Sequence, residues 1–115
     1  MKNLKKKNLI DFENNIISLF NNSKIKAPIH LHSNNEENLI KIFKKINKDD
    51  WVFSSWRSHY HCLLKGVPEK ILTKEILKGN SISLCFPKYK IYSSAIVGGS
   101  LPIATGLALS IKKKN

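Results

Sequence analysis

Arg57 is the residue of this 115-residue chain whose type most strongly suggests a chemical task. The chain has 20 basic side chains, and all of the others are lysines. A guanidinium holds a phosphate or a carboxylate through two parallel hydrogen bonds, which a lysine ammonium cannot do. Arg57 is therefore either an anion-binding residue or one half of a structural ion pair.

Histidine pairs are the second chemical feature, because His30 is followed by His32 and His59 by His61. Alternate residues of a strand share a face, so each pair could present two imidazoles to one metal ion. The spacing between the pairs fits no standard zinc module, and the chain has no Cys-x-x-Cys segment. We therefore predict no metal site and separate roles for the histidines.

Gly98 and Gly99 lie between an apolar stretch and Ser100. They predict a tight turn from a strand into a helix, because glycine adopts backbone conformations that other residues avoid. In such a turn a ligand can approach the backbone closely. The free amides at the start of the helix favour polar or anionic groups.

The elements that must position these residues follow from the spacing of apolar side chains. Helices are predicted over 9–20, 60–65, 68–77 and 100–111, and a further helix is predicted to begin after a cap at Ser33 or Asn34. Gly66 and Gly79 are expected to end two of these helices in the left-handed conformation. Apolar runs at 51–53 and 96–97 predict two short buried strands, and 80–94 is expected to be irregular. Because strands and helices alternate, the predicted fold class is α/β with parallel pairing. Ligands bind beyond the carboxyl ends of such strands, where Arg57 and the glycine turn both fall.

The net charge of +12 raises the alternative of a small basic nucleic-acid-binding protein. Seven lysines lie near the two ends, at positions 2, 5–7 and 112–114, and the body is correspondingly less basic. No basic stripe interleaved with aromatic residues accompanies the charge. We therefore expect no nucleic-acid partner.

The uncharged segment 91–111 has the length of a membrane span, but it contains two adjacent glycines, a proline and several serines. We expect two short buried elements there and no membrane association. The N-terminus lacks the apolar region of a secretory signal, and two cysteines are too few for a disulfide framework. These features predict a cytoplasmic protein.

Several segments, in this order and spacing, resemble the α subunit of the thiamine-diphosphate-dependent 2-oxo acid dehydrogenases, the pyruvate, branched-chain and acetoin enzymes. Segment 30–36 is similar to the family's His-Leu-x-x-Gly-Gln-Glu, and 50–59 is similar to its Asp-x-x-x-x-x-Tyr-Arg-x-His. Gly66 and Glu75 fall where the family has a Gly and an Ala-Glu pair. Segment 95–109 is similar to Gly-Ile-Val-Gly-x-x-x-Pro-x-Ala-x-Gly-x-Ala-x-Ala.

The resemblance implies a thiamine diphosphate site. The family's Tyr-Arg pair binds the cofactor diphosphate, and Trp56 and Arg57 stand at these positions. Trp56 lacks the hydroxyl of the usual Tyr. The family's Ile-Val-Gly segment makes backbone contacts to the aminopyrimidine ring, which assigns Ala95 and Val97 to the cofactor.

The resemblance also implies catalytic roles for two histidines. His30 matches the His that lines the substrate end of the family's site, and His59 matches the second His. Both would suit proton transfer or oxyanion stabilisation near neutral pH.

The resemblance runs from about Ile29 to Lys112, and it implies an incomplete thiamine-diphosphate-binding fold with a parallel sheet flanked by helices. We expect 1–28 to form an N-terminal helical segment and 29–115 a partial dehydrogenase domain. The family holds Mg²⁺ with a Gly-Asp-Gly segment and a later Asn, which we expect in a downstream segment. The isolated chain should therefore be inactive, and its last helix should make it prone to aggregation.

The implied function is that of a fragment of the α subunit of an enzyme that oxidatively decarboxylates a 2-oxo acid and passes the acyl group to lipoamide. The implied partners are a β-type subunit, which supplies the glutamate that activates the cofactor, and a lipoyl-bearing acyltransferase. One alternative is a non-catalytic remnant that pairs with a β-type subunit. The other is the basic nucleic-acid-binding protein considered above.

Overall fold

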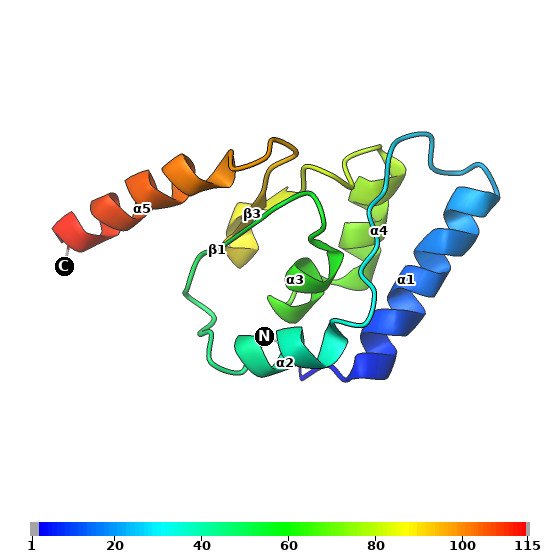
Figure 1. Ribbon diagram of the computed structural model, residues 1–115, viewed down its shortest axis with the longest axis horizontal. Coiled ribbons are helices and arrows are strands. Elements are labelled where there is room, and N and C mark those ends of the chain that lie inside the picture. The colour runs from blue at the N-terminus through cyan, green and yellow to red at the C-terminus, as the bar shows by residue number, and fades with distance from the viewer. Residues whose placement is uncertain (1–2, 115) are drawn as a thin grey trace.

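A small sheet separates a group of four helices from a single helix in the computed structural model (Figure 1). The structure describes residues 3–114, so Met1, Lys2 and Asn115 lie outside it, including one lysine of the predicted basic tail. The elements, in chain order, are α1 (Lys6–Asn21), α2 (Glu36–Phe43), β1 (Val52–Ser54), α3 (His59–Leu64), α4 (Glu69–Leu77), β2 (Cys85–Phe86), the 3₁₀ turn η1 (Pro87–Tyr89), β3 (Ile91–Ser93) and α5 (Ser100–Lys114). Helices together with strands confirm the predicted α/β class.

The helices form where apolar side chains recur at helical spacing. In α1, Leu9, Phe12 and Ile16 point into the core. Gly66 and Gly79 have φ angles of 99° and 93° and follow α3 and α4, which confirms the predicted left-handed ends.

The predicted cap of α2 at Ser33 or Asn34 is wrong. The helix follows Asn35, whose side chain makes no capping hydrogen bond. Asn34 instead adopts φ 58° and makes the left-handed turn that leads into the helix.

The sheet has three strands in the order β1-β3-β2. Strand β1 pairs with β3 in parallel, with Val52 opposite Ile91 and Ser54 opposite Ser93. Strand β2 pairs with β3 in antiparallel orientation, so the sheet is mixed. The predicted parallel pairing is confirmed for β1 and its neighbour.

The predicted strand at 96–97 is wrong, and so is the irregular structure predicted over 80–94. The strand is Ile91–Ser93, and Ile91 is completely buried in the core cluster. Ile96 and Val97 lie in a turn, where the N–H of Gly99 donates to the carbonyl of Ile96 at 2.9 Å. Pro87 begins η1 between two strands, so it does not end the ordered structure.

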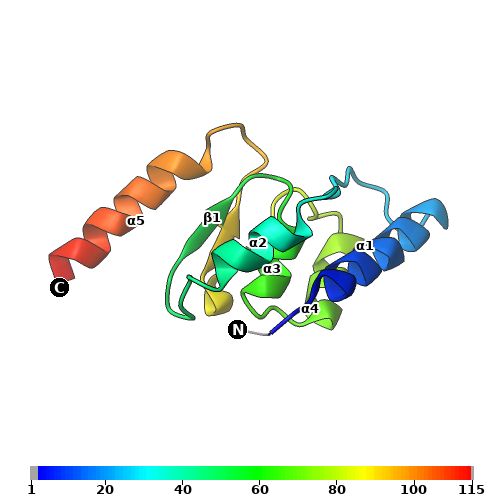
Figure 2. The same cartoon turned by 60° about the horizontal axis from the view of Figure 1, so that its bottom comes forward.

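Helices α1–α4 lie together on one side of the sheet (Figure 2), and one core cluster contains residues of these helices and of strands β2 and β3. It contains these buried apolar residues: Leu9, Phe12, Ile16, Ile25, Leu39, Phe43, Tyr60, Cys62, Leu63, Leu64, Val67, Leu72, Ile76, Leu84, Phe86 and Ile91. Helix α1 belongs to the same cluster as the later elements. The predicted boundary at residue 28 stays a prediction.

Lys65 is a buried cation that fixes the loop before β1. Its Nζ donates to the carbonyl oxygens of Asp50, Lys48 and Asn47 at 2.6, 2.9 and 3.3 Å. Burial lowers the pKa of Lys65, and the charge of Asp50 opposes this effect. The three carbonyls replace the water that the ammonium loses, and they tie this loop to the end of α3.

Within residues 3–114, no helix is both long and apolar enough to cross a membrane. The cytoplasmic location stays a prediction.

Candidate functional site

The segments predicted to bind the cofactor leave the sheet at the same edge. Parallel strands β1 and β3 end at Ser54 and Ser93. Directly beyond them, the N–H of Ser94 donates to the carbonyl of Ser54 at 3.1 Å. The segment with Trp56 and Arg57 and the turn from Ala95 to Gly99 therefore start side by side. This is the geometry expected of a ligand site at the carboxyl ends of parallel strands.

The turn after β3 is closed tightly around Gly99. A Cβ at Gly99 would lie 2.8 Å from Ser94 Oγ and 3.0 Å from the Cβ of Ile96, so only glycine fits without a shift. Ser94 Oγ also accepts the N–H of Ile96 at 3.1 Å. Gly98, with φ 72°, faces open space.

Ala95 and Val97 are exposed on the outer side of this turn, Val97 to 81%. Within residues 3–114, no protein group bonds to the backbone N–H or carbonyl of either residue. These backbone donors and acceptors are therefore open to a ligand. The role of Ala95 and Val97 in binding the aminopyrimidine ring stays a prediction.

Trp56 and His30 are brought together from distant parts of the chain. Their rings meet edge to face with centroids 6.2 Å apart, and both residues are half-buried. Arg57, next to Trp56, is exposed. No ion pair to Arg57 occurs in the part of the chain that the structure describes, so its guanidinium is free to meet an anion.

His59 lies in the core, with its side chain completely buried. Its Nδ1 is 3.2 Å from Glu13 Oε2, and its Nε2 is 2.7 Å from Ser81 Oγ. Both ring nitrogens are therefore engaged with protein groups, unlike those of a residue that faces a substrate. A role of His59 in proton transfer stays a prediction. Its buried position favours a structural role, in which it keeps the neighbouring segment of the site in place.

Glu13, which the sequence analysis did not single out, is buried on the core face of α1. Burial alone would raise the pKa of its carboxyl, but hydrogen bonds from His32 and His59 outweigh burial and lower it to about 2. A signal was present in the sequence, because Glu13 follows Leu9 by four residues and precedes Ile16 by three. It therefore lies on the apolar stripe of the helix.

A cluster of polar rings surrounds Glu13. The rings of His32 and Tyr60 stack with centroids 4.1 Å apart, and Tyr60 donates its hydroxyl proton to Glu36 at 3.1 Å. Burial, and then the charges of Glu13 and Glu36, raises the pKa of Tyr60. Burial, and to a lesser extent His32, lowers the pKa of His61 to about 4. Tyr60 therefore stays protonated and His61 stays neutral near neutral pH.

The Cys62 side chain is completely buried. Burial raises the pKa of the Cys62 thiol to about 12, which makes it unreactive. Across residues 3–114, no three His, Cys, Asp or Glu side chains group closely enough to hold a metal ion.

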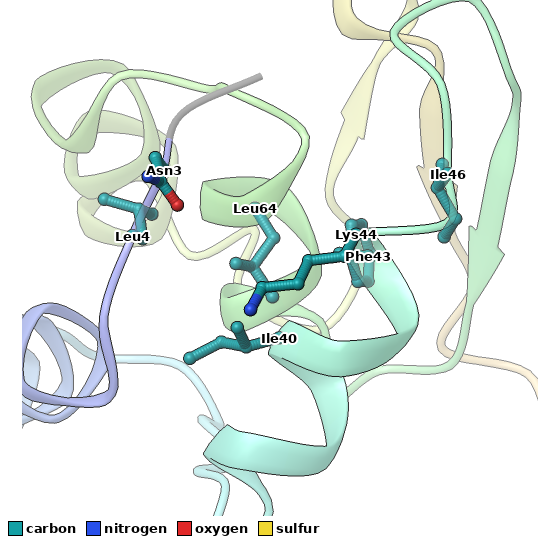
Figure 3. A pocket seen from close by; sticks show the side chains of 7 residues that line it. All are labelled: Asn3, Leu4, Ile40, Phe43, Lys44, Ile46 and Leu64. Carbon is teal, nitrogen blue, oxygen red and sulfur yellow. The ribbon is translucent and has the colours of Figure 1, made fainter.

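A cavity of about 230 Å³ opens between the N-terminal segment, α2 and α3 (Figure 3). Apolar side chains of Leu4, Ile40, Phe43 and Leu64 form most of its wall, with Ile46, Asn3 and Lys44 at its sides. None of the residues predicted for the site lines it. Arg57, Ala95 and Val97 are instead exposed on the surface.

Comparison with known proteins gives consistent matches. The sequence model of the family "Dehydrogenase E1 component" matches residues 5–115. Pyruvate dehydrogenase E1 component subunit alpha-3, chloroplastic, of Oryza sativa subsp. japonica is 26% identical over 114 residues, which cover 90% of this chain and 27% of the relative. The α subunit of acetoin:2,6-dichlorophenolindophenol oxidoreductase of Cupriavidus necator is 29% identical over 118 residues, 94% of this chain and 35% of the relative.

A third relative, the pyruvate dehydrogenase E1 component subunit alpha of Rickettsia prowazekii, is 31% identical over 111 residues, 88% of this chain and 34% of the relative. The chain thus spans about a third of the length of these curated relatives. No solved structure matches.

Proposed function

The chain belongs to the dehydrogenase E1 component family, and we propose from this that it supplies part of the thiamine diphosphate site of a 2-oxo acid dehydrogenase α subunit. The observation that carries the proposal is the meeting of two loops at one edge of the sheet. Arg57 follows β1 there, and the glycine turn follows the neighbouring parallel strand. In α/β sheets this edge is where ligands bind.

The reaction proposed for the assembled enzyme is the oxidative decarboxylation of a 2-oxo acid with transfer of the acyl group to lipoamide. Thiamine diphosphate, when bound, would supply the electron sink that makes loss of carbon dioxide possible. The chain's own task is to bind and orient this group. Mg²⁺ would neutralise the diphosphate, and we propose that its ligands come from the Gly-Asp-Gly and Asn segment that the resemblance places downstream.

Arg57 is proposed to bind the diphosphate through its forked guanidinium. Its exposure leaves its donors available, and lysine could not replace its bidentate geometry. Trp56 would flank the same group, with its ring fixed against that of His30. The backbone of Ala95 and Val97 would hold the aminopyrimidine ring through its free N–H and carbonyl groups.

His30 is the chain's candidate for proton transfer at the substrate. Its half-buried ring lies beside Trp56, at the edge of the proposed site. An imidazole changes its charge near neutral pH, as a general acid or base must. His59, the second candidate, is enclosed in the core, so it would act by keeping the neighbouring segment with Trp56 and Arg57 in place.

The proposed partners are a β-type subunit and a lipoyl-bearing acyltransferase. Because the family's activating glutamate comes from the β subunit, the 115 residues alone should not decarboxylate any 2-oxo acid. The non-catalytic alternative shares this pairing with a β-type chain but lacks cofactor binding. Measuring cofactor binding in an assembled complex separates the two.

A chimeric α subunit provides that test. Residues 5–115 of this chain would replace the matching segment of the Rickettsia prowazekii subunit, expressed with the subunit that completes that E1 component. The chimera should bind thiamine diphosphate and decarboxylate pyruvate. Changing Arg57→Ala should weaken cofactor binding by about 1.5–3 kcal/mol, the contribution of a hydrogen bond to a charged group.

The control is Lys74→Ala, which removes an exposed cation from α4 and should leave the cofactor Kd unchanged. An assembled chimera that binds no thiamine diphosphate contradicts the proposed function. Equal cofactor affinity with Arg57 and with Ala at this position contradicts the assigned role of the arginine.

A further inference from the structure

Glu13 joins two segments that are distant in sequence from α1 and from each other. Its Oε1 accepts the backbone N–H of His32 at 2.7 Å, across 19 residues of sequence. Its Oε2 lies 3.2 Å from Nδ1 of His59, across 46 residues. The carboxylate is only 4% exposed, so both bonds are formed away from competing water.

Each of these two segments carries residues of the proposed site. His30 precedes His32 by two residues, and Arg57 precedes His59 by two residues. Across the gap between the segments, the rings of His30 and Trp56 are in contact. A carboxylate that holds both segments therefore also sets the relation between His30 and the Trp56–Arg57 pair.

In its neutral form, the histidine held by Glu13 fits its two contacts as one tautomer. An ionised carboxylate can only accept, so Nδ1 of His59 donates to Glu13. Nε2 then accepts the hydroxyl proton of Ser81 at 2.7 Å. A serine, a histidine and a carboxylate in this order also occur in hydrolytic sites, where the serine attacks a substrate. Here Ser81 and His59 are completely buried, so no substrate can reach the hydroxyl and the chain of bonds serves to hold His59.

We propose that Glu13 is a positioning residue, whose two carboxylate oxygens fix the His30 segment and the Trp56–His59 segment in the geometry that the cofactor site requires. The inference deepens the proposed function and rests on it for the identity of the site. The forked contact itself is a property of the chain and can be tested without cofactor.

The first test measures the contact between His30 and Trp56 by fluorescence. In a Trp51→Phe background, Trp56 is the remaining tryptophan, and a protonated imidazole beside it quenches its emission. Emission is recorded from about pH 8 to pH 5, the range in which imidazoles take up a proton. A His30→Ala variant should abolish the pH-dependent quenching, which verifies the reporter.

Glu13→Ala should reduce the amplitude of this quenching at least about twofold, because the N–H of His32 loses its acceptor and the His30 segment moves. Glu13→Gln should keep most of the amplitude, because its amide oxygen can still accept that N–H. Asp11→Ala, which changes an exposed carboxylate on the same helix, is the matched control and should have no effect. Quenching that is unchanged in folded Glu13→Ala protein overturns the proposal.

The second test uses Glu13→Gln and does not depend on whether the alanine variant folds. If the amide oxygen takes the N–H of His32, the amide NH₂ faces Nδ1 of His59, and the imidazole proton must move to Nε2. Nitrogen NMR of the histidine rings should therefore show the Nδ1–H tautomer in the parent chain and the Nε2–H tautomer in the variant. A His59 tautomer that stays the same in both contradicts the forked contact.

The chimera distinguishes the failure of this inference from the failure of the proposed function. Glu13→Ala in the chimera should weaken thiamine diphosphate binding about tenfold, the scale of effect of displaced binding groups. A chimera that binds cofactor equally well with Glu13 and with Ala at this position overturns the positioning role and leaves the proposed function intact. A parent chimera without cofactor binding contradicts the proposed function. The fluorescence and NMR results then still show whether Glu13 holds the two segments.

Discussion

The buried Glu13 and the half-buried His61 have pKa values far from their ordinary ones. For Glu13 the folded value of about 2 lies below the ordinary 4.5, because the bonds from His32 and His59 outweigh burial. For His61 the folded value of about 4 lies below the ordinary 6.5, because burial disfavours the imidazolium. In both cases the unfolded chain takes up the proton first, so acid favours unfolding.

The two residues should destabilise the fold in separate pH ranges. The contribution of His61 is complete above pH 6.5 and is lost as the pH falls toward about 4. The contribution of Glu13 is complete above pH 4.5 and is lost as the pH falls toward about 2. Each shift corresponds to about 3 kcal/mol in the free energy of unfolding.

Denaturant titrations of dilute protein at a series of pH values would check this. His61→Gln should flatten the upper part of the stability profile, and Glu13→Gln the lower part. Glu37→Gln, an exposed change on α2, is the control and should leave both slopes in place. A parent profile without loss of stability between pH 6.5 and 4 would show that His61 is not held neutral by burial.

The turn between β3 and α5 is the element that shapes the proposed cofactor face. Ser94 closes it by accepting the N–H of Ile96, and Gly99 packs directly against the same hydroxyl. The exposed backbone of Ala95 and Val97 depends on this closure. A substitution that opens the turn should therefore alter the proposed cofactor face, even when the substituted residue is not part of that face.

Two glycine-to-alanine changes near this turn should have opposite effects. Gly99→Ala should destabilise the chain by about 1–3 kcal/mol, because the new Cβ meets Ser94 Oγ at 2.8 Å. Gly106→Ala, inside α5 and with open space around its Cβ, should stabilise by about 0.5–1 kcal/mol through helix propensity. Chemical denaturation of both variants measures the difference. Equal effects of the two changes on the free energy of unfolding would mean that the turn accommodates the new Cβ without a loss of stability.

At the scale of the whole molecule, the chain is elongated, with extents of 48 × 27 × 23 Å. Helix α5 accounts for this shape, because it extends away from the body and contacts β1 (Figures 1 and 2). A space of about 470 Å³ remains between α5 and β1, lined by Trp51, Phe53, Leu107 and neighbouring residues. The helix exposes Leu101 to 69% and Leu109 to 56%.

This exposed apolar helix should cause the 115-residue chain to associate with itself. Sedimentation velocity should show an average mass that rises with micromolar protein concentration. The double change Leu101→Lys and Leu109→Lys should restore a monomer without loss of the core. Ile71→Lys and Leu77→Lys, at apolar positions of α4 that are exposed to 42% and 43%, form the control and should leave association in place. A parent chain that is monomeric at all concentrations would contradict this prediction.

The sequence by itself determined the parts of the structure that depend on local patterns. The apolar spacing in α1, the left-handed glycines after α3 and α4 and the α/β class all follow from residues close together in the chain. The placement of Arg57 beyond a strand was also predictable, because it follows the apolar run 51–53. The glycine turn was predicted to follow a strand at 96–97, whereas the strand that precedes it is Ile91–Ser93. What these residues bind stays a prediction that the family membership supports.

Only the tertiary structure decided where β3 lies and what Glu13 does. Strand β3 is short and lies outside any apolar run, so the local pattern did not locate it, and Ile91 is buried in a core cluster with residues from distant parts of the chain. The apolar stripe of α1 indicates that Glu13 faces inward, but its partners are 19 and 46 residues away. His30 and His59 are both histidines, but His30 lies at the proposed site and His59 is enclosed in the core. Burial and hydrogen-bond partners are set by contacts between distant segments, which local sequence patterns do not encode.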